Sequence, residues 1–300
     1  MQVNREMRLA RATKSPAPPL FYQNPVLLRS GPNVRSGLTG SKGYDFARGA
    51  VTVPIGVSEF PLAARHYPIV FAAAELAPVV VLGEGGANHF VEPDGTWRPG
   101  HYVPGYIRRY PFALTTMPDC VEPMLAIDTA SDRFVGNIDQ AEGASRFFDD
   151  EGRPTDTARK AMQICQDYRD DCQRAEAFAK ALRNAGLLVP RQASMKWANG
   201  SGSAPDGFLD IDERVFRTLS ISTIAQWRGD CWLVLIALVL ASKHNWQALV
   251  DRRGPHRPAD PRAPTNNSPL DCRFPPIPFV FHPERNCGGD RIWKIPGIAG

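Results

Sequence analysis

Four basic residues next to aromatic ones are the side chains of this sequence best suited to bind a ligand. They form two pairs, at positions 65–66 and 108–109, and a tyrosine follows each pair directly. A guanidinium group carries a planar fork of donors that matches a carboxylate or a phosphate. A tryptophan at position 97 can supply an aromatic wall. The candidate ligand-binding residues are therefore Arg65, His66, Trp97, Arg108 and Arg109.

The same residues also have a structural reading, which stays open at this point. Arginine side chains often stack on aromatic rings and pair with nearby acids, and Glu59 and Glu92 are available here. Successive residues point about 100° apart on a helix and to opposite faces of a strand. Arg108 and Arg109 cannot both face one ligand, so if they bind an anion we expect one to point into a pocket while the other anchors the segment.

Metal, phosphate-loop and nucleophile chemistry find little support in the sequence. His89 and His101 have no second histidine at ligand spacing, and no CxxC motif occurs. The glycine-rich stretch Gly83–Gly86 leads into an apolar strand pattern and does not open a helix, so we interpret it as a hairpin turn. Cys165 and Cys172 fall on an apolar stripe, where a thiol stays protonated. We predict no metal site and no cofactor, and the sequence identifies no catalytic residue.

The front half of the chain has the pattern of strands. Short apolar runs alternate with turn residues from Val51 to Leu125. Pro78–Leu82 and Asn88–Val91 are predicted to pair as a hairpin around Gly83–Gly86. Further along, we expect a short helix and then two strands. These are Tyr102–Arg109, Tyr110–Leu114 and Met124–Asp128.

The back half has the pattern of helices. Apolar residues recur every three or four positions from Ala161 to Leu182, which predicts an amphipathic helix capped by Thr155 or Asp156 and ended by Gly186. Cys231–Leu240 is apolar on every side, so we predict that it is the buried central helix, capped by Asp230. The remaining predicted elements are a strand at Leu187–Pro190, a hairpin at Met195–Phe208, a helix from Asp212 to Leu219, and a continuation through Trp246–Val250. The fold class is α+β, with a mostly β front half.

Composition divides the chain into three parts. The hydrophobic content of 43% is sufficient for a real core. Beyond Gly254, ten of the 28 prolines fall in a stretch without periodicity, which predicts a disordered tail. We therefore predict a basic lead at 1–19, one domain at 20–253 and a proline-rich tail at 254–300.

Charge and apolar runs limit the partners and the compartment. The total charge of +4 is concentrated in the lead and the tail, so the predicted domain has no excess of positive charge with which to hold nucleic acid. No apolar stretch follows the basic lead, and Cys231–Ala241 is shorter than the about 20 residues of a membrane span. We expect a soluble cytoplasmic protein with reduced cysteines, with a cell-surface location by a non-Sec route as the alternative.

Several blocks keep a fixed order from about Leu20 to Arg253. The blocks are Leu20–Val26, Glu59–Phe71, Asn88–Trp97, Tyr102–Phe112, Phe148–Thr155, the helix up to Leu188, and Leu240–Arg253. In this order they resemble the SapC family of bacterial proteins, which is named for a protein linked to surface-layer function. The resemblance implies an association with the surface layer, and in many relatives a genomic association with outer-membrane uptake receptors and tailoring enzymes. It implies no known catalytic residue.

Two functions from different classes follow from these observations. The first is a non-enzymatic scaffold or interaction protein, linked to envelope or surface-layer assembly through an unknown protein partner. The alternative is an enzyme or binder that acts on a small anionic metabolite through an Arg/His/aromatic pocket. Convergence of the basic residues with Trp97 in a pocket would favour the second, and their dispersal over the surface would favour the first.

Overall fold

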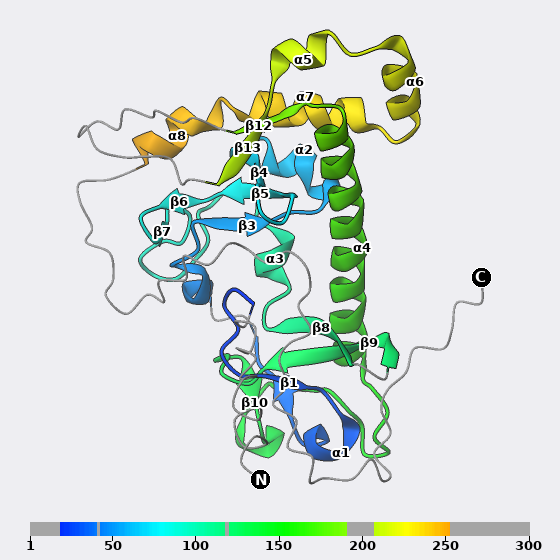
Figure 1. Cartoon of the computed structure of the whole chain (residues 1–300). Coiled ribbons are helices and arrows are strands. Elements are labelled where there is room, and N and C mark those ends of the chain that lie inside the picture. Colours follow the sequence, from blue (N-terminus) through cyan, green and yellow to red (C-terminus); the bar gives the residue numbers. More distant parts are fainter. Residues whose placement is uncertain (1–18, 41–42, 118–119, 191–206, 253–300) are drawn as a thin grey trace, which may run out of the picture.

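Antiparallel sheets and helices together make up the chain, which confirms the α+β class (Figure 1). A computed structural model describes residues 19–40, 43–117, 120–190 and 207–252. Strands dominate before residue 150, and long helices follow it. The predicted tail, most of the lead and most of the Met195–Phe208 hairpin lie outside the described residues.

A five-stranded antiparallel sheet forms the upper part of the molecule in Figure 1. Its two middle strands, β4 and β5, are buried along their whole length. Strands covered on both faces lose the alternation of polar and apolar residues, and the run of valines in β5 shows this. In spatial order the strands are β12 (Leu188–Pro190), β13 (Phe208–Ile211), β4 (Ile69–Ala72), β5 (Ala77–Val81) and β3 (Thr52–Pro54).

The predicted pairing of Pro78–Leu82 with Asn88–Val91 is wrong. β5 pairs with β3 and β4 instead. The turn itself is confirmed, because β6 (Gly83–Glu84) and β7 (Ala87–Asn88) form a two-stranded ladder around Gly85 and Gly86. Both glycines have positive φ angles, of 56° and 78°, which other residues rarely adopt.

A second sheet lies in the lower part of the molecule, and short ladders lie beside it (Figure 1). The buried carboxylate of Asp128 accepts hydrogen bonds from the backbone of Gln23 and Asn24 and from the Tyr110 hydroxyl. These bonds tie the start of the chain to the second sheet. The sheet consists of β1 (Pro25–Leu27), β9 (Cys120–Asp128) and β8 (Phe112–Met117); beside it lie α1 (Ser30–Asn33), β2 (Gly37–Leu38), β10 (Phe134–Val135), η4 (Ile138–Gln140) and β11 (Ser145–Arg146).

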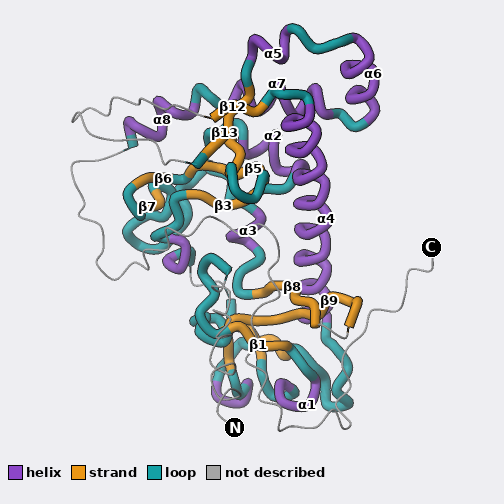
Figure 2. The backbone as a smooth tube through the Cα atoms, in the orientation of Figure 1, coloured by secondary structure: helices purple, strands orange, loops and turns teal. Residues whose placement is uncertain are grey.

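The long helix α4 (Asp156–Asn184) runs beside both sheets and joins them (Figure 2). The amphipathic helix predicted from the spacing is confirmed, as is its end before Gly186, whose φ is 70°. Thr155 occupies the N-cap position, but its hydroxyl donates to backbone oxygens of Arg146 and Phe147 and makes no capping hydrogen bond. Its buried face contacts β8 near the start and β5 further along. One continuous apolar face thus stabilises two sheets.

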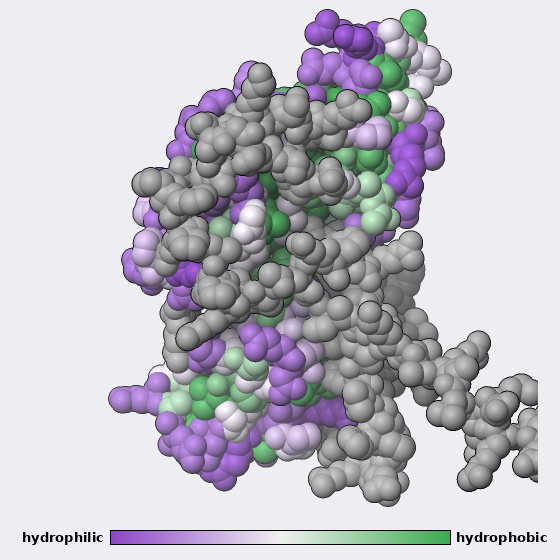
Figure 3. Space-filling view, turned by 60° about the vertical axis from the view of Figure 1, so that its left-hand side comes forward, coloured by the Kyte–Doolittle hydropathy of each residue, from purple (hydrophilic) through white to green (hydrophobic). Residues whose placement is uncertain are grey.

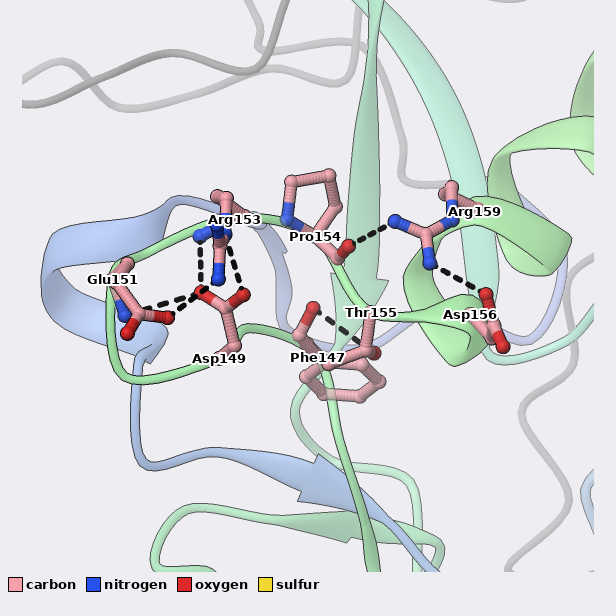
Figure 4. A network of polar contacts seen from close by, with 8 residues as sticks. All are labelled: Phe147, Asp149, Glu151, Arg153, Pro154, Thr155, Asp156 and Arg159. Carbon is pink, nitrogen blue, oxygen red and sulfur yellow. Dashed lines mark hydrogen bonds and ion pairs between the residues drawn. The ribbon is translucent and has the colours of Figure 1, made fainter.

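An ion-pair network at the start of α4 explains the acidic turn that precedes it (Figure 4). Arg153 donates hydrogen bonds to Asp149 and Glu151, and the Asp149 carboxylate also accepts the backbone N–H of Arg153. The hydrogen bond from Arg153 lowers the pKa of Asp149. Because these groups are exposed, their contribution is to the shape of the turn more than to stability.

The 3₁₀ turn η3 (Val57–Glu59) is held against α4 by a buried aspartate. Asp171 accepts hydrogen bonds from the Ser58 backbone N–H at 3.0 Å and from the Ser58 hydroxyl at 2.6 Å. The backbone of Gly56 lies so close to Asp171 that a methyl group there would overlap the carboxylate. A glycine is therefore required at position 56.

We expect Gly56→Ala to lower the free energy of unfolding by about 2 kcal/mol or more, because overpacking of a buried polar contact has no easy relief. Gly40→Ala is the matched control, since a methyl group at Gly40 meets nothing within 4 Å. Urea unfolding of both variants measures the difference. Equal midpoints for the two variants would contradict the close approach.

Four helices end the described chain: α5 (Glu213–Arg217), α6 (Ile221–Gly229), α7 (Trp232–Ser242) and α8 (Asn245–Asp251). The predicted cap of Asp212 is confirmed, because its side chain accepts from the backbone of Arg214 and Val215. The predicted cap of Asp230 is wrong, because Cys231, with a φ of 58°, precedes α7.

The prediction that α7 is a buried central helix is also wrong. Only Ile236, Val239 and Ser242 of α7 are buried, and Val234 is 59% exposed. α7 contacts α2, α6, β4 and β13, and the side that carries Val234 is exposed. The α7–α8 segment, Trp232–Asp251, has a mean hydropathy of 1.4 and is long and apolar enough to cross a membrane. Core helices of soluble proteins can have the same length and composition, so this is weak evidence for a membrane span. An apolar composition therefore did not establish burial on every side.

Candidate functional site

Tyr67 is the centre around which the candidate residues gather. It follows the short helix α2 (Phe60–Ala63) and is fully buried. Its hydroxyl donates to the backbone oxygen of Tyr102 and accepts the Trp97 Nε1–H at 3.3 Å. The Phe90 ring lies 4.7 Å from the Tyr67 ring. Tyr67, Phe90 and Trp97 thus form an aromatic base.

Basic side chains cover this base. The imidazole rings of His66 and His101 lie 5.1 Å apart, and Arg252 Nη2 donates to His101 Nε2 at 3.1 Å. The guanidinium of Arg252 stands 4.8 Å above the centre of the Phe90 ring. We call His66, His101 and Arg252, together with this base, the Arg252 cluster; Arg65, next to His66 in the chain, is exposed.

The hydrogen bonds of His101 fix the orientation of its ring. Nδ1 lies 3.0 Å from the backbone oxygen of Pro99, which can only accept. On the other side of the ring, Nε2 lies 3.1 Å from Nη2 of Arg252, which can only donate. His101 therefore connects the Pro99 backbone to Arg252 and orients the guanidinium.

Helix α8 closes the cluster from the far end of the described chain. Asn245, its first residue, donates to the backbone oxygens of Ala64 and Tyr67 at 2.8 and 3.0 Å. Arg252, just past its last residue, contacts His101. The start of α8 thereby fixes the turn that carries His66, and the end of α8 positions the Arg252 guanidinium.

The electrostatics of the cluster favour an anion. Burial lowers the pKa of His66, and the nearby His101, Arg65 and Arg252 lower it further. Burial, and then Arg98, lower the pKa of Arg252. Arg252 Nη1 is shielded from solvent and has no hydrogen-bond partner among the residues that the structure describes. Positive charge is concentrated here, and part of the donor capacity of Arg252 is not used.

Arg108 lies beside this cluster and is exposed. Arg108 is the last residue of α3 (Gly105–Arg108). Its guanidinium donates to the Val103 backbone oxygen and to the Tyr102 hydroxyl, both at 3.0 Å. The Tyr102 hydroxyl in turn donates to the buried carboxylate of Glu59 at 2.9 Å. Arg108 is therefore connected to Tyr67 through Tyr102, whose backbone oxygen accepts from Tyr67.

Arg109 points the other way, into a cage of tyrosines. It is 4% exposed, and its guanidinium lies 4.4 Å from the ring centre of Tyr106 and 4.9 Å from that of Tyr168. Burial raises the pKa of Tyr168, so its phenol is neutral and presents its face to the cation. Arg108 and Arg109 diverge as their spacing required, and Arg109 anchors α3 to α4.

The five predicted residues are thus only partly brought together. His66 and Trp97 lie beside Tyr67, and Arg65 is exposed next to His66. Arg108 borders them through Tyr102, and Arg109 is buried elsewhere. His101 and Arg252 are the residues that sequence reasoning missed as ligand-binding groups. The contact between them spans 151 positions, and no local pattern marks it.

Other chemistry is limited in the described part of the chain. No group of three or more His, Cys, Asp and Glu residues that could hold a metal ion occurs there. Burial raises the pKa of Cys165 to about 11 and that of Cys172 to about 12, so both thiols are protonated at neutral pH. A small apolar cleft lined by Leu28, Met124 and Phe148 lies at the second sheet, away from these groups.

Comparison with known proteins gives a family but no named relative. The family model for SapC matches residues 35–249, which include the five-stranded sheet, β8 and β9 of the second sheet, and α4; β1 and Arg252 lie outside the matched range. No curated protein and no solved structure matches the chain. Because the match covers more than half of the sequence, the chain belongs to the SapC family.

Proposed function

We propose that this SapC-family chain is a non-enzymatic binding protein that holds a small carboxylate at the Arg252 cluster. The observation that carries the proposal is the contact between Arg252 and His101, with His66 alongside. Gathering basic groups on an aromatic base costs free energy during folding, and such arrangements are concentrated at functional sites. A bound anion offsets that cost.

The chemistry of the side chains favours a carboxylate. The plane of the Arg252 guanidinium stacks on the Phe90 ring. Its N–H donors lie in that plane and can therefore bind the two oxygens of a planar carboxylate. His66 gains a proton readily once a negative charge lies beside it. His101 is a positioning residue, because its two hydrogen bonds are already made.

Substitution of Arg252 tests the proposal. We expect the wild-type chain to bind acetate, succinate or benzoate in calorimetric titrations, and Arg252→Lys to bind about 10-fold or more weakly, because the fork is lost while the charge stays. Arg228→Lys, at an exposed position of α6, is the matched control and should bind as the wild type does. Wild-type binding of inorganic phosphate but of no carboxylate, or equal affinities of the two variants, would overturn the proposal.

The pH dependence of binding provides a second prediction. The pKa of His66 is lowered in the free protein, and a bound anion raises it, so binding takes up a proton. Affinity for benzoate should therefore rise as the pH falls from 8 toward the pKa of His66. His66→Gln should remove most of this dependence, whereas His244→Gln, at an exposed position before α8, should keep it. Titrations at several pH values measure the slope, and identical slopes in all three proteins would argue against His66.

A link to surface-layer or envelope assembly is the wider role that we propose for this binding, with a protein of the envelope as the partner. The family name supports it, since SapC is the matching family. Fractionation of cells that produce the tagged chain tests the link. Recovery with envelope proteins, lost in Arg252→Lys, is the expected result; a chain found only in the soluble fraction with no envelope partner would contradict it.

A further inference from the structure

An apolar face on α6 and α7 is exposed to solvent within the described residues. Ile221 is 86% exposed, Ile224 41% and Val234 59%. The rings of Trp227 and Trp232, in edge contact at 5.7 Å, join the two helices beside these residues. In Figure 3, hydrophobic and hydrophilic residues alternate at the top of the molecule, where Figure 1 places α5 and α6. We call Ile221, Ile224, Trp232 and Val234 the α6–α7 face.

Exposure of this face is unusual for its composition. α7 carries eleven residues, nearly all apolar, of which three are buried. Exposed apolar surface of this kind is a site of association or of aggregation. A stable occupant is therefore expected.

The chain itself contains a segment of matching chemistry. Phe274–Phe281 reads Phe-Pro-Pro-Ile-Pro-Phe-Val-Phe, with five large apolar residues, three prolines and no charge. Proline-rich segments bind aromatic-lined surfaces because their backbone has few donors to satisfy and little entropy to lose. Trp232, which is only partly buried, supplies an aromatic ring at this face, and it is held in place by edge contact with the buried Trp227.

The segment is close enough in sequence to reach the face. Arg252 is the last residue that the structure describes, and residues 253–273 separate it from Phe274. An extended chain of that length spans up to about 70 Å. The 20 residues of α7 and α8 extend over roughly 30 Å, so the spacer can return along them to the α6–α7 face. Because the segment is tethered, its effective concentration at the face is in the millimolar range, about the value that a short flexible linker gives.

We propose that Phe274–Phe281 docks on the α6–α7 face of its own chain. The contact covers Val234 and Ile221 and explains how an apolar helix remains at the edge of the domain. It is independent of carboxylate binding at the Arg252 cluster, so either proposal can fail alone.

A photo-cross-linking experiment on the full chain tests the docking. A benzoylphenylalanine at position 234 should form an intramolecular cross-link to the peptide that contains residues 274–281, detected by mass spectrometry of the digested monomer. The matched control is the same amino acid at position 164 on α4, where the native Ile164 is 52% exposed. That position should give no cross-link to residues 274–281.

A triple substitution of the segment separates specific docking from chance contact. Ile277→Ser, Phe279→Ser and Phe281→Ser together keep the prolines and the length, and should reduce the cross-link from position 234 at least fivefold. Three outcomes would overturn the proposal: equal cross-linking from 164 and 234, cross-links from 234 only to a second copy of the chain, or cross-links from 234 only to lipid when anionic vesicles are added. The first denotes random contact, and the others assign the face to a dimer or to a membrane.

Discussion

Replacing Glu59 by alanine is expected to lower the free energy of unfolding by about 3–5 kcal/mol, because a buried acceptor of three hydrogen bonds is lost. The Glu59 carboxylate accepts from the backbone of Gly56 at 2.9 Å, from the backbone of Gly105 at 2.6 Å and from the Tyr102 hydroxyl. Alanine leaves all three donors buried without that acceptor. It also opens a cavity between η3 and α3.

Burial has a visible effect on Glu59. It raises the pKa of this carboxyl group, and the three hydrogen bonds act in the opposite direction. The residue therefore depends on its partners to remain in the interior. Gly105 is adapted to the same contact, since a methyl group there would lie 3.1 Å from a Glu59 oxygen.

Urea unfolding followed by circular dichroism measures the effect of Glu59→Ala. Glu92→Ala is the matched control, because Glu92 is half-buried and its ion pair with Arg98, at 3.8 Å, is long. The control should change stability by about 0.5 kcal/mol or less. Similar unfolding midpoints for the two variants would show that the Glu59 network contributes little.

The parts of the fold that follow from local pattern could be predicted from the sequence. The helix α4 follows from apolar spacing alone, and its end follows from Gly186. The turn at Gly85 and Gly86 follows from the need for positive φ angles. These features depend on neighbours in the chain, so the residues themselves contain the information.

The parts that depend on distant contacts could not be predicted. β5 pairs with β3 and β4, and nothing in its run of valines chooses those partners over the next apolar run. The helix α6 was missed because its apolar and polar residues alternate without a clear stripe. Both features are determined by which surfaces meet in three dimensions.

The candidate site shows the same division. Arg65, His66 and Trp97 could be selected because basic and aromatic residues are adjacent in sequence. Arg109 has the same local signature, yet its side chain enters the tyrosine cage. His101 and Arg252 had no signature, because only the position of α8 brings them together. Residue types in the sequence thus indicated which side chains are suited to bind an anion. The packing of distant elements determined which of them lie together at the candidate site.

Two substitutions in α7 should have opposite outcomes. Ile236→Asp is expected to lower the free energy of unfolding by about 4 kcal/mol or more, because Ile236 is fully buried and an unpaired carboxylate would replace it. Val234→Asp should cost about 1 kcal/mol or less, since position 234 is exposed and lies in the first turn of α7, where the helix dipole favours an acid.

The pair tests whether α7 lies at the surface, because the two positions are two residues apart on one helix. A helix buried on every side would lose comparable stability at both positions. Thermal and urea unfolding of the full chain measure both variants. If Val234→Asp unfolds the protein as Ile236→Asp does, the exposed α6–α7 face does not exist in solution. If the Val234→Asp variant is stable and the Ile236→Asp variant unfolds, one side of α7 packs against β4 and the other side is accessible to the docked segment.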